Sequence, residues 1–297
     1  MARCPRLSEG FISETAAREL YGFAAAQDRL GPIRIGALKL NARFDFTDQV
    51  AIVTGAGKGL GRRIALAFAA AGANVVLAGR HLDTLEKTRH EVLKVGRRAL
   101  SIPTDVQNIA QISELVDRVV KELGTVHILV NNAGVNRTGS SLEVSEQTWD
   151  WIINSNVKGM FFACQAAARV MIPRRYGKII NIGSIISNIG LGFNVPYASS
   201  KGAVLQLTKS LALEWAKHGI NVNGIGPGYI LTDQVRWLFE NVELAGRIRA
   251  KQPGGEIGTE DDIAQATLFL ASEAAHHING AMLYIDGASA AGWMGPE

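Results

Sequence analysis

Cysteine is scarce in this chain of 297 residues, and its scarcity excludes two classes of protein. Only Cys4 and Cys164 are present, far apart and without a second cysteine or a histidine beside either of them. Disulfide-stabilised folds and cysteine-based zinc sites both need several cysteines at characteristic spacings. We therefore predict no bound metal and no disulfide framework, a pattern typical of the reducing cytoplasm.

The chain also lacks a transmembrane segment and a strong excess of one charge. The uncharged run over residues 64–79 is rich in Ala and Gly and contains Asn74, whereas a membrane span needs about 20 consecutive apolar residues. We interpret this run as a helix, a turn and a buried strand. The net charge is only +4, and the basic residues are scattered in short pairs. The sequence therefore predicts neither a membrane nor a nucleic-acid partner.

The first 44 residues lack the features of a targeting segment. A secretory signal needs an apolar core, which is absent here, and a transit peptide is poor in acids. Acidic residues occur at Glu9, Glu14, Glu19 and Asp28. We predict a flexible N-terminal extension over residues 1–44 and assign it no role.

From Asp48 onward, short β-rich apolar runs alternate with longer helical patterns. Several runs are nearly continuous in Val, Ile and Leu, which is typical of strands buried on both faces of a parallel sheet. Repeated β-α-β units predict an α/β fold, a doubly wound parallel sheet of the Rossmann type. The expected strands are Val50–Thr54, Asn74–Ala78, Ala99–Pro103, Ile128–Asn131, Lys178–Ile182, Asn221–Ile225 and Met282–Ile285. The expected helices are Leu60–Ala71, Leu82–Val95, Ile109–Leu123, Ser145–Ile172, Tyr197–Lys217 and Asp261–Ala271.

No repeat or linker interrupts this alternation, so we predict a single Rossmann-type dehydrogenase domain over residues 45–290, followed by a tail over 291–297. Residues 229–258 depart from the pattern, with Trp237, Leu238 and Phe239 followed by a Pro-Gly-Gly break. A long insertion at the ligand edge of such a sheet usually covers the site. We predict a short lid there, with helical packing alone as the alternative.

A glycine-rich loop, Thr54-Gly55-Ala56-Gly57-Lys58-Gly59-Leu60-Gly61, follows the first strand and opens the first helix. In this context Gly55 can form the tight turn, Gly59 lets the backbone approach a pyrophosphate, and Gly61 permits close helix–strand packing. The helix N-terminus beyond it offers unpaired N–H groups to phosphates. The loop therefore predicts a dinucleotide site.

The end of the second strand suggests which dinucleotide is bound. A carboxylate at this place would hold the ribose 2′-hydroxyl of NAD, but the chain has Arg80. Lys58 projects from the glycine loop toward the same region, and two cations near one phosphate make charge-assisted hydrogen bonds. We predict NADP(H) rather than NAD(H). The alternative is that both cations are simply solvated.

Tyr197 and Lys201 lie four residues apart at the start of a helix that Pro196 opens, and so share one face. An ammonium beside a phenol stabilises the phenolate and lowers a pKa that is ordinarily about 10. Such a tyrosine can take a proton from an alcohol, or return it to a carbonyl, while a cofactor moves hydride. Alone, a Tyr-x-x-x-Lys pair is more often an ordinary surface pair; the other motifs reverse that expectation.

Taken together and in order, five motifs resemble the short-chain dehydrogenase/reductase family, over about residues 46–287. The likeness implies an oxidoreductase that interconverts a carbonyl and a secondary alcohol with an NADP(H) cofactor. The motifs are Thr54–Gly61, Asn131–Gly134, Ser184, Tyr197–Lys201 and Pro227–Gly228.

The resemblance implies roles for individual residues. Ser184 holds the substrate oxygen together with Tyr197, and Lys201 also binds the nicotinamide ribose. Asn156 anchors a water of a proton relay, and Asn131 braces the central strand. The implied catalytic set is Asn156, Ser184, Tyr197 and Lys201. Asp105 bonds the adenine amino group and Thr232 the nicotinamide carboxamide, and the full set of implied cofactor contacts is Thr54, Gly55, Gly57, Lys58, Gly59, Leu60, Gly61, Arg80, Asp105, Val106, Asn132, Ala133, Gly134, Tyr197, Lys201, Pro227, Gly228, Ile230 and Thr232.

Two positions depart from the family pattern. The family usually has a second glycine after the Asp-Gly of the last strand, where this chain has Ala288 after Asp286 and Gly287. It also tends to have an arginine before the final helix, where this chain has Glu256. These departures concern the lid and the subunit contacts rather than the hydride chemistry.

Arg137, just after the Asn131–Gly134 motif, bears on the substrate because a guanidinium there can pair with a carboxylate. This stretch, with Ile179–Ser184 and Trp215, is similar to gluconate 5-dehydrogenase-like members, so we expect a keto-sugar acid or polyol substrate. An Arg137 on a solvated rim is an equal alternative. A 3-oxoacyl-carrier-protein reductase-like activity and a general carbonyl reductase share the catalytic residues and stay open.

The sequence argues against two functions of other classes. A non-catalytic redox sensor that binds NADP(H) would commonly lack the tyrosine or lysine, and both are present. An S-adenosylmethionine-dependent methyltransferase would not need the basic strand end. By resemblance we also expect a homotetramer or homodimer that pairs through the helices of residues 156–172 and 197–217.

Overall fold

The computed structural model describes residues 44–232, 246 and 252–292. The chain divides into one unit of residues 1–42 and a second of residues 43–297. The predicted N-terminal extension, most of the predicted lid and the end of the predicted tail lie outside the described residues. All of the described residues belong to the second unit.

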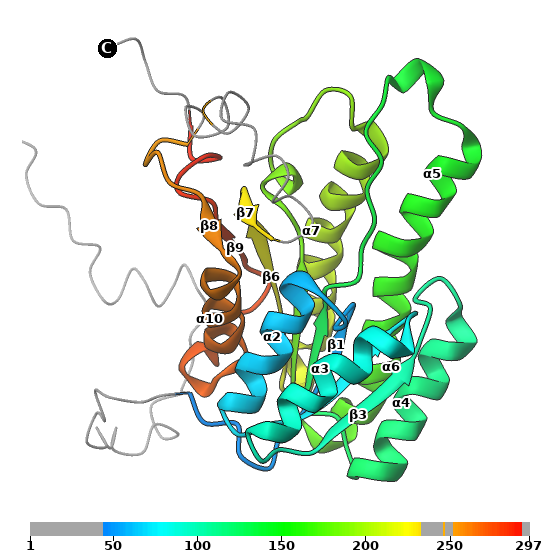
Figure 1. The fold of residues 1–297 in the computed structure, drawn as a ribbon, viewed down its shortest axis with the longest axis vertical. Coiled ribbons are helices and arrows are strands. Elements are labelled where there is room, and N and C mark those ends of the chain that lie inside the picture. Colours follow the sequence, from blue (N-terminus) through cyan, green and yellow to red (C-terminus); the bar gives the residue numbers. More distant parts are fainter. Residues whose placement is uncertain (1–43, 233–245, 247–251, 293–297) are drawn as a thin grey trace, which may run out of the picture. The chain divides into compact units, whose positions relative to one another are not determined.

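Seven parallel strands form one sheet in the order β3-β2-β1-β4-β5-β6-β9, which confirms the predicted doubly wound fold (Figure 1). All seven were predicted, and β6 is longer than expected. Their bounds are β1 Val50–Thr54, β2 Asn74–Gly79, β3 Ala99–Pro103, β4 Ile128–Asn131, β5 Gly177–Ile182, β6 Ile220–Pro227 and β9 Met282–Ile285. A separate two-stranded sheet, β7 Ile230–Leu231 with β8 Gly258–Thr259, was not predicted.

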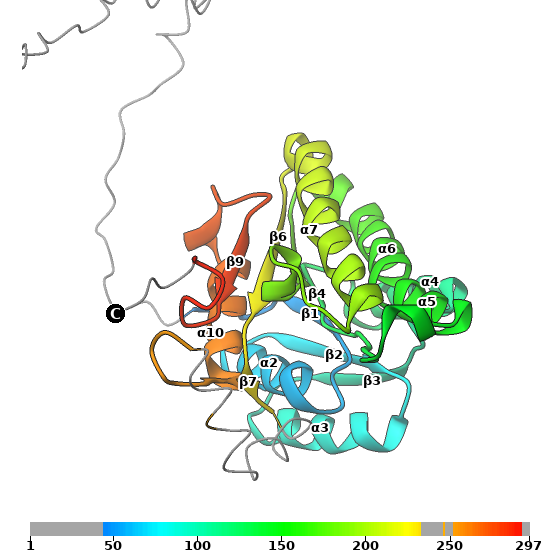
Figure 2. The same ribbon diagram turned by 90° about the horizontal axis from the view of Figure 1, so that it is seen from above.

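Helices cover both faces of the large sheet (Figure 2). One face carries α2 Gly59–Ala70, α3 Leu82–Lys94 and α10 Glu260–Ala271, and the other carries α4 Ile109–Leu123, α6 Gly159–Arg174 and α7 Val195–Trp215. The remaining short elements are η1 Ser141–Glu143, α5 Glu146–Ile153, η2 Asn154–Lys158, η3 Ile185–Ser187, η4 Ala216–His218 and η5 Glu273–Ala275.

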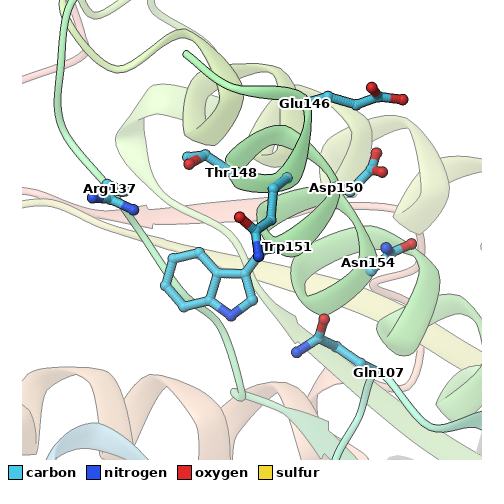
Figure 3. Close-up of a pocket in the computed structure, with 8 residues that line it drawn as sticks. Gln107, Arg137, Glu146, Thr148, Asp150, Trp151 and Asn154 are labelled. Atoms are coloured by element: carbon cyan, nitrogen blue, oxygen red, sulfur yellow. The ribbon is translucent and has the colours of Figure 1, made fainter. Parts of the chain in front are cut away.

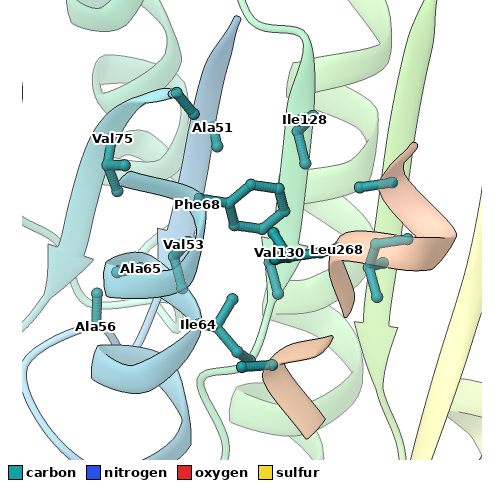
Figure 4. Close-up of a cluster of buried hydrophobic side chains, with 14 of the residues drawn as sticks. Ala51, Val53, Ala56, Ile64, Ala65, Phe68, Val75, Ile128, Val130 and Leu268 are labelled. Atoms are coloured by element: carbon teal, nitrogen blue, oxygen red, sulfur yellow. The ribbon is translucent and has the colours of Figure 1, made fainter. Parts of the chain in front are cut away.

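Alternate residues of each strand belong to different cores, because successive side chains of a strand point to opposite faces. In β1, Ala51 and Val53 pack under α2 and α10, whereas Val50 and Ile52 pack under α4 and α6. Figure 4 shows Phe68 of α2 lying over the central strands in the first of these cores. Burial on both faces is the reason why these strands appear in the sequence as continuous apolar runs.

The strand order reverses between β1 and β4, which are hydrogen-bonded neighbours. From β1 the chain moves outward to β2 and β3, and from β4 it moves the other way to β5, β6 and β9. Ligands of such sheets bind outside the carboxyl ends of the strands at this point. The fold therefore places the glycine loop after β1 and the Asn131–Gly134 motif after β4 side by side.

The predicted single helix over 145–172 is wrong in one detail. It is divided into α5 and α6 by a π-helical turn, η2, in which the N–H of Gly159 donates to the carbonyl of Asn154. Such turns insert one residue into an α-helix and often occur at functional sites. Among the described residues, no helix is long and apolar enough to cross a membrane, and no cluster of three metal-ligating side chains occurs.

Candidate active site

A cleft with a volume of about 560 Å³ lies at the carboxyl ends of the central strands. Its walls come from the loops that follow β1, β2, β3, β4, β5 and β6, and from the start of α7. Residues far apart in the sequence therefore meet here, as expected for the switch point of a doubly wound sheet.

The glycine loop after β1 forms one wall, with backbone shapes that require glycine. Gly55 and Gly59 have φ angles of 67° and 54°, a region that side chains disfavour. A Cβ atom on Gly61 would lie 2.3 Å from the Gly55 carbonyl oxygen, so only glycine permits the packing of α2 on the loop. The N-cap residue of α2, Lys58, makes no side-chain cap hydrogen bond, and the first turn contains no acid. The N–H groups of this turn therefore suit a phosphate.

Thr54, predicted as a cofactor contact, instead braces the loop from behind. Its Oγ1 accepts hydrogen bonds from the N–H groups of Asn132 and Ala133, both at 3.0 Å. The Asn132 side chain returns a bond of 2.9 Å to the Thr54 carbonyl. Neither Thr54 nor Gly61 lines the cleft. Both are buried, and the bonds of Thr54 join the ends of β1 and β4.

The two predicted phosphate-binding cations do face the cleft. Lys58 extends from the glycine loop and Arg80 follows β2, and both are exposed. Within the described residues neither forms an ion pair, so both remain able to bind an anion. His81 and Thr84 line the same part of the cleft and were missed. Both lie within four residues of Arg80 in the sequence, and this closeness is the signal that could have identified them.

Tyr197, Lys201 and Ser184 meet at the opposite end of the cleft. Tyr197 and Lys201 lie one turn apart on α7, and the Lys201 Nζ is 5.5 Å from the centre of the Tyr197 ring. The same Nζ donates a hydrogen bond of 2.8 Å to the carbonyl of Ile182, the last residue of β5. Ser184 is the N-cap of η3, and its hydroxyl acts to lower the pKa of the Tyr197 phenol.

The pKa predicted for Tyr197 is wrong in direction. Burial raises the pKa of Tyr197, and the hydrogen bond from Ser184 lowers it by less. Burial also lowers the pKa of Lys201 to about 8. Moving the phenolate charge out of water raises the pKa of Tyr197 by more than the Ser184 hydroxyl lowers it. The four-residue spacing of Tyr197 and Lys201 gave no information on burial.

Asn156 does not line the cleft; its side chain is fully buried beneath it. Its Nδ2 donates to the carbonyl of Val135 at 2.9 Å and to the hydroxyl of Ser200 at 3.0 Å. Its Oδ1 accepts from the Val135 N–H at 2.8 Å. Ser200 in turn donates to the Tyr197 carbonyl. Asn156 therefore links the π turn, the loop after β4 and the start of α7.

Most of the other predicted contacts meet in the cleft. Asp105 follows β3, and its carboxylate accepts from the backbone N–H of Gln107 at 3.0 Å. The predicted residues that line the cleft are Gly55, Gly57, Lys58, Gly59, Leu60, Arg80, Asp105, Val106, Asn132, Ala133, Gly134, Ser184, Tyr197, Lys201, Pro227, Gly228, Ile230 and Thr232. The other lining residues were missed; they include Gly79, Gln107, Asn136 and Tyr229 beside the same strand ends, and Ser155 of the π turn.

Arg137 does not line this cleft. It lines a second hollow beside it, together with residues of α5 and Gln107, which the two hollows share. The prediction placed Arg137 near the nicotinamide because it follows the Asn131–Gly134 motif closely. Asn136 still lines the cleft, whereas the next residue, Arg137, lines only the second hollow, so closeness in sequence did not place Arg137 in the cleft.

A family model described as short chain dehydrogenase matches residues 49–243. The chain belongs to the short-chain dehydrogenase family. It is 41% identical over 253 residues to the 2-dehydro-3-deoxy-D-gluconate 5-dehydrogenase of Dickeya dadantii (strain 3937), a match that covers 84% of this chain and 97% of that protein. It is 36% identical over 244 residues to the gluconate 5-dehydrogenase of Gluconobacter oxydans (strain 621H), which covers 82% and 95%.

A solved structure supports the same assignment. The gluconate 5-dehydrogenase from Burkholderia cenocepacia J2315, in complex with NADP and tartrate, matches with a TM-score of 0.81 and 35% identity, over 84% of this chain and 98% of that one. This short-chain dehydrogenase is accordingly an oxidoreductase that acts on hydroxyl and carbonyl groups, as the sequence predicted.

Proposed function

We propose that this short-chain dehydrogenase interconverts a sugar acid or related polyol and its keto form, with NADP(H) as the hydride carrier. The observation that carries the proposal is the meeting of Tyr197, Lys201 and Ser184 with the glycine loop in one cleft. The cleft fits a dinucleotide, because it combines a side-chain-free glycine loop with the unpaired first turn of α2. The relatives named above supply the substrate class.

In the direction of oxidation, Tyr197 removes the hydroxyl proton of the substrate while the carbon–hydrogen bond breaks. The glycine loop, Lys58 and Arg80 would hold NADP⁺, which when bound would supply the acceptor for the hydride released from that carbon. Ser184 donates a hydrogen bond to the substrate oxygen and holds it near the phenol. Lys201, with its Nζ 5.5 Å from the phenol ring, stabilises the phenolate electrostatically. In the direction of reduction, Tyr197 returns its proton to the oxygen of the carbonyl.

Asn156 contributes to this reaction from behind the cleft. Both side-chain groups of Asn156 are bonded to Val135 and Ser200, so the side chain acts as a brace. We therefore propose Asn156 as a positioning residue, which holds the loop after β4 and, through Ser200, the start of α7 that carries Tyr197 and Lys201.

NADP(H) is proposed over NAD(H) because Lys58 and Arg80 face the cleft without ionic partners in the described chain. The relative from Burkholderia cenocepacia binds NADP. We expect the KM for NADP⁺ to be at least tenfold lower than that for NAD⁺, since hydrogen bonds to charged groups contribute about 1.5–3 kcal/mol. Steady-state kinetics with both cofactors measure this ratio. A lower KM for NAD⁺ would contradict the cofactor proposal and leave the reaction type untouched.

The substrate class is tested by a screen over sugar acids, polyols, acyl thioesters and simple ketones, with absorbance at the nicotinamide band as the readout. Fastest turnover of a sugar acid or polyol supports the proposal. Preference for an acyl thioester or a simple ketone would instead indicate the carrier-protein reductase or general carbonyl reductase. Cofactor binding without any turnover would indicate a redox sensor.

The catalytic assignment is tested by Tyr197→Phe, which removes only the phenol oxygen. We expect turnover to fall by about 100-fold to 10,000-fold, the usual contribution of a positioned acid–base group. NADPH affinity, measured by fluorescence titration, should be unchanged because the glycine loop is intact. A variant that keeps more than a few per cent of its turnover would overturn this role.

The proposal includes a homo-oligomer, a tetramer or a dimer, paired through α6 and α7. Apolar side chains on the outer sides of these helices support it, and Leu213 is 82% exposed. The buried, free thiol of Cys164 accords with a reducing compartment, and we include the cytoplasm in the proposal.

A further inference from the structure

The hollow that contains Arg137 has a volume of about 760 Å³ and is more open than the catalytic cleft. Figure 3 shows the indole of Trp151 with Arg137 to one side and Gln107 beneath it. Its lining residues are Gln107, Arg137, Glu146, Gln147, Thr148, Asp150, Trp151 and Asn154. Glu146, Asp150 and Asn154 lie four residues apart along α5 and the π turn, and so on one face.

Nearly all of this polar lining has no side-chain partner among the residues that the structure describes. Within the described parts of the chain, Arg137 makes no ion pair, although Glu146 and Asp150 line the same hollow. Thr148 is the exception, since its hydroxyl accepts a hydrogen bond of 3.1 Å from Ser145. An aromatic platform thus stands among donors and acceptors that are free to bind a ligand.

The combination selects one ligand chemistry. An indole face packs against the C–H groups of a carbon chain or ring, while carboxylates and amides accept from and donate to hydroxyls. A guanidinium pairs with a carboxylate through two parallel bonds. A phosphate dianion is repelled by Glu146 and Asp150 more strongly than a singly charged carboxylate held at Arg137, and a purely apolar ligand would leave most of the polar lining unpaired. A polyhydroxylated carboxylate satisfies all of these groups at once.

We propose that this hollow is a second binding site for a sugar acid, beside the catalytic cleft. Arg137 takes the carboxylate, Trp151 packs against the carbon chain, and Glu146 and Asp150 accept from its hydroxyls. Gln107 lines both hollows, so the site adjoins the cleft directly. The choice of a sugar acid rests on the proposed function; the need for a polyhydroxylated anion comes from the lining itself.

The test is calorimetric titration of D-gluconate into the full chain carrying Tyr197→Phe and saturated with NADP⁺, so that binding is measured without turnover. Adding Trp151→Ala should weaken gluconate binding at the hollow by about tenfold, since aromatic contacts contribute about 0.5–1.5 kcal/mol beyond their buried area. Trp149→Ala is the matched control: Trp149 lies on the same helix, is 40% exposed and does not line the hollow. It should leave binding unchanged.

Substitutions of Arg137 provide a second, independent test of the site. Arg137→Ala should weaken gluconate binding by about tenfold to 100-fold and remove the preference for gluconate over sorbitol, an uncharged polyol of the same length. Arg137→Lys should restore part of that preference. Circular dichroism melting shows that each variant folds, and Trp151→Phe keeps an aromatic platform if Trp151→Ala does not fold.

Gluconate binding that is equal in the parent, Trp151→Ala and Arg137→Ala proteins would overturn the site. The proposed function fails on a different readout, namely the absence of NADP-dependent gluconate turnover by the unmodified chain. In that event the Trp151 and Arg137 titrations still decide whether the hollow binds a polyhydroxylated anion.

Discussion

Lys201 is buried without an acidic partner among the described residues, and the cost of this burial to the free energy of folding can be measured. Only 5% of its surface is exposed, and its Nζ donates to a single backbone carbonyl. Burial lowers its pKa from 10.5 to about 8. Below pH 8 the folded protein therefore holds a charge that the unfolded chain solvates better. That penalty disappears as the pH rises from 8 to 10.5, because the folded state binds fewer protons in this window.

Lys201→Met should accordingly stabilise the fold while abolishing catalysis. We expect the free energy of unfolding at pH 7 to rise by on the order of 1–2 kcal/mol, since the charge penalty is removed and one hydrogen bond to Ile182 is lost. The gain should shrink at pH 9.5. Urea unfolding at both pH values measures it, with Lys209→Met, an exposed lysine of the same helix, as the control. A destabilised Lys201→Met protein at pH 7 would show that the charge is not penalised.

The spacing of Tyr197 and Lys201, together with the family resemblance, was enough to find the chemical groups of the site but not their environment. The pattern Tyr197-x-x-x-Lys201 placed both side chains on one face of a helix, and the structure brings Ser184 to them. The raised pKa of Tyr197 was not predictable, because it depends on burial by loops distant in sequence. Thr54 was misassigned for a similar reason: a motif position does not reveal whether a side chain faces the ligand or the protein behind it.

Regular elements followed from local patterns, and irregular ones did not. All seven strands of the large sheet were predicted because each is a short β-rich, largely apolar run between helical patterns. The π turn at Asn154–Lys158 was missed, since its residues fit an ordinary helix. It coincides with buried side-chain bonds from Asn156 to Val135 and Ser200, which no pattern of period 3.6 encodes. The β7–β8 pair was not predicted because each strand has only two residues, too few to form a recognisable pattern.

The turn after β9 shows how one departure from a family pattern strains an element. Ala288 occupies the position where the family usually has glycine, and its φ angle is 69°. The turn is held by Asp286, whose carboxylate accepts from the N–H groups of Ala288 and Ala290. These bonds keep Ala288 in the left-handed region, which costs an L-residue about 1–2 kcal/mol.

Ala288→Gly should therefore stabilise the protein. Relief of the left-handed cost exceeds the added freedom of the unfolded chain, about 0.4–1 kcal/mol, so we expect a net gain of roughly 0.5–1 kcal/mol. The control is Ala290→Gly in the same turn, where φ is negative and glycine should destabilise. Chemical denaturation of the two variants should give changes of opposite sign. Equal destabilisation by both would show that the backbone at 288 carries no strain.

At the scale of the whole molecule, the two faces of the sheet are covered, yet apolar side chains remain on the outside of the covering helices. Phe161 and Phe162 of α6 are only partly buried against their own core and pack on each other in a T-shaped, edge-to-face arrangement, with ring centres 5.2 Å apart. Leu213 of α7 is 82% exposed. Scattered exposed leucines are ordinary, but these lie on the two helices that the proposed assembly pairs.

A symmetric interface doubles the effect of any substitution within it, because each residue occurs on both subunits. If copies pair through α6 and α7, Leu213→Glu removes two apolar contacts, each contributing about 1.5–3 kcal/mol when fully buried, and places two like charges in the interface.

We expect light scattering on a size-exclusion column to show a multiple of 31.9 kDa for the unmodified chain and a smaller multiple for Leu213→Glu. Ser113→Glu, which adds the same charge on exposed α4, should leave the mass unchanged. An unmodified chain of monomeric mass would refute the assembly, and equal masses for all three proteins would move the interface away from α7.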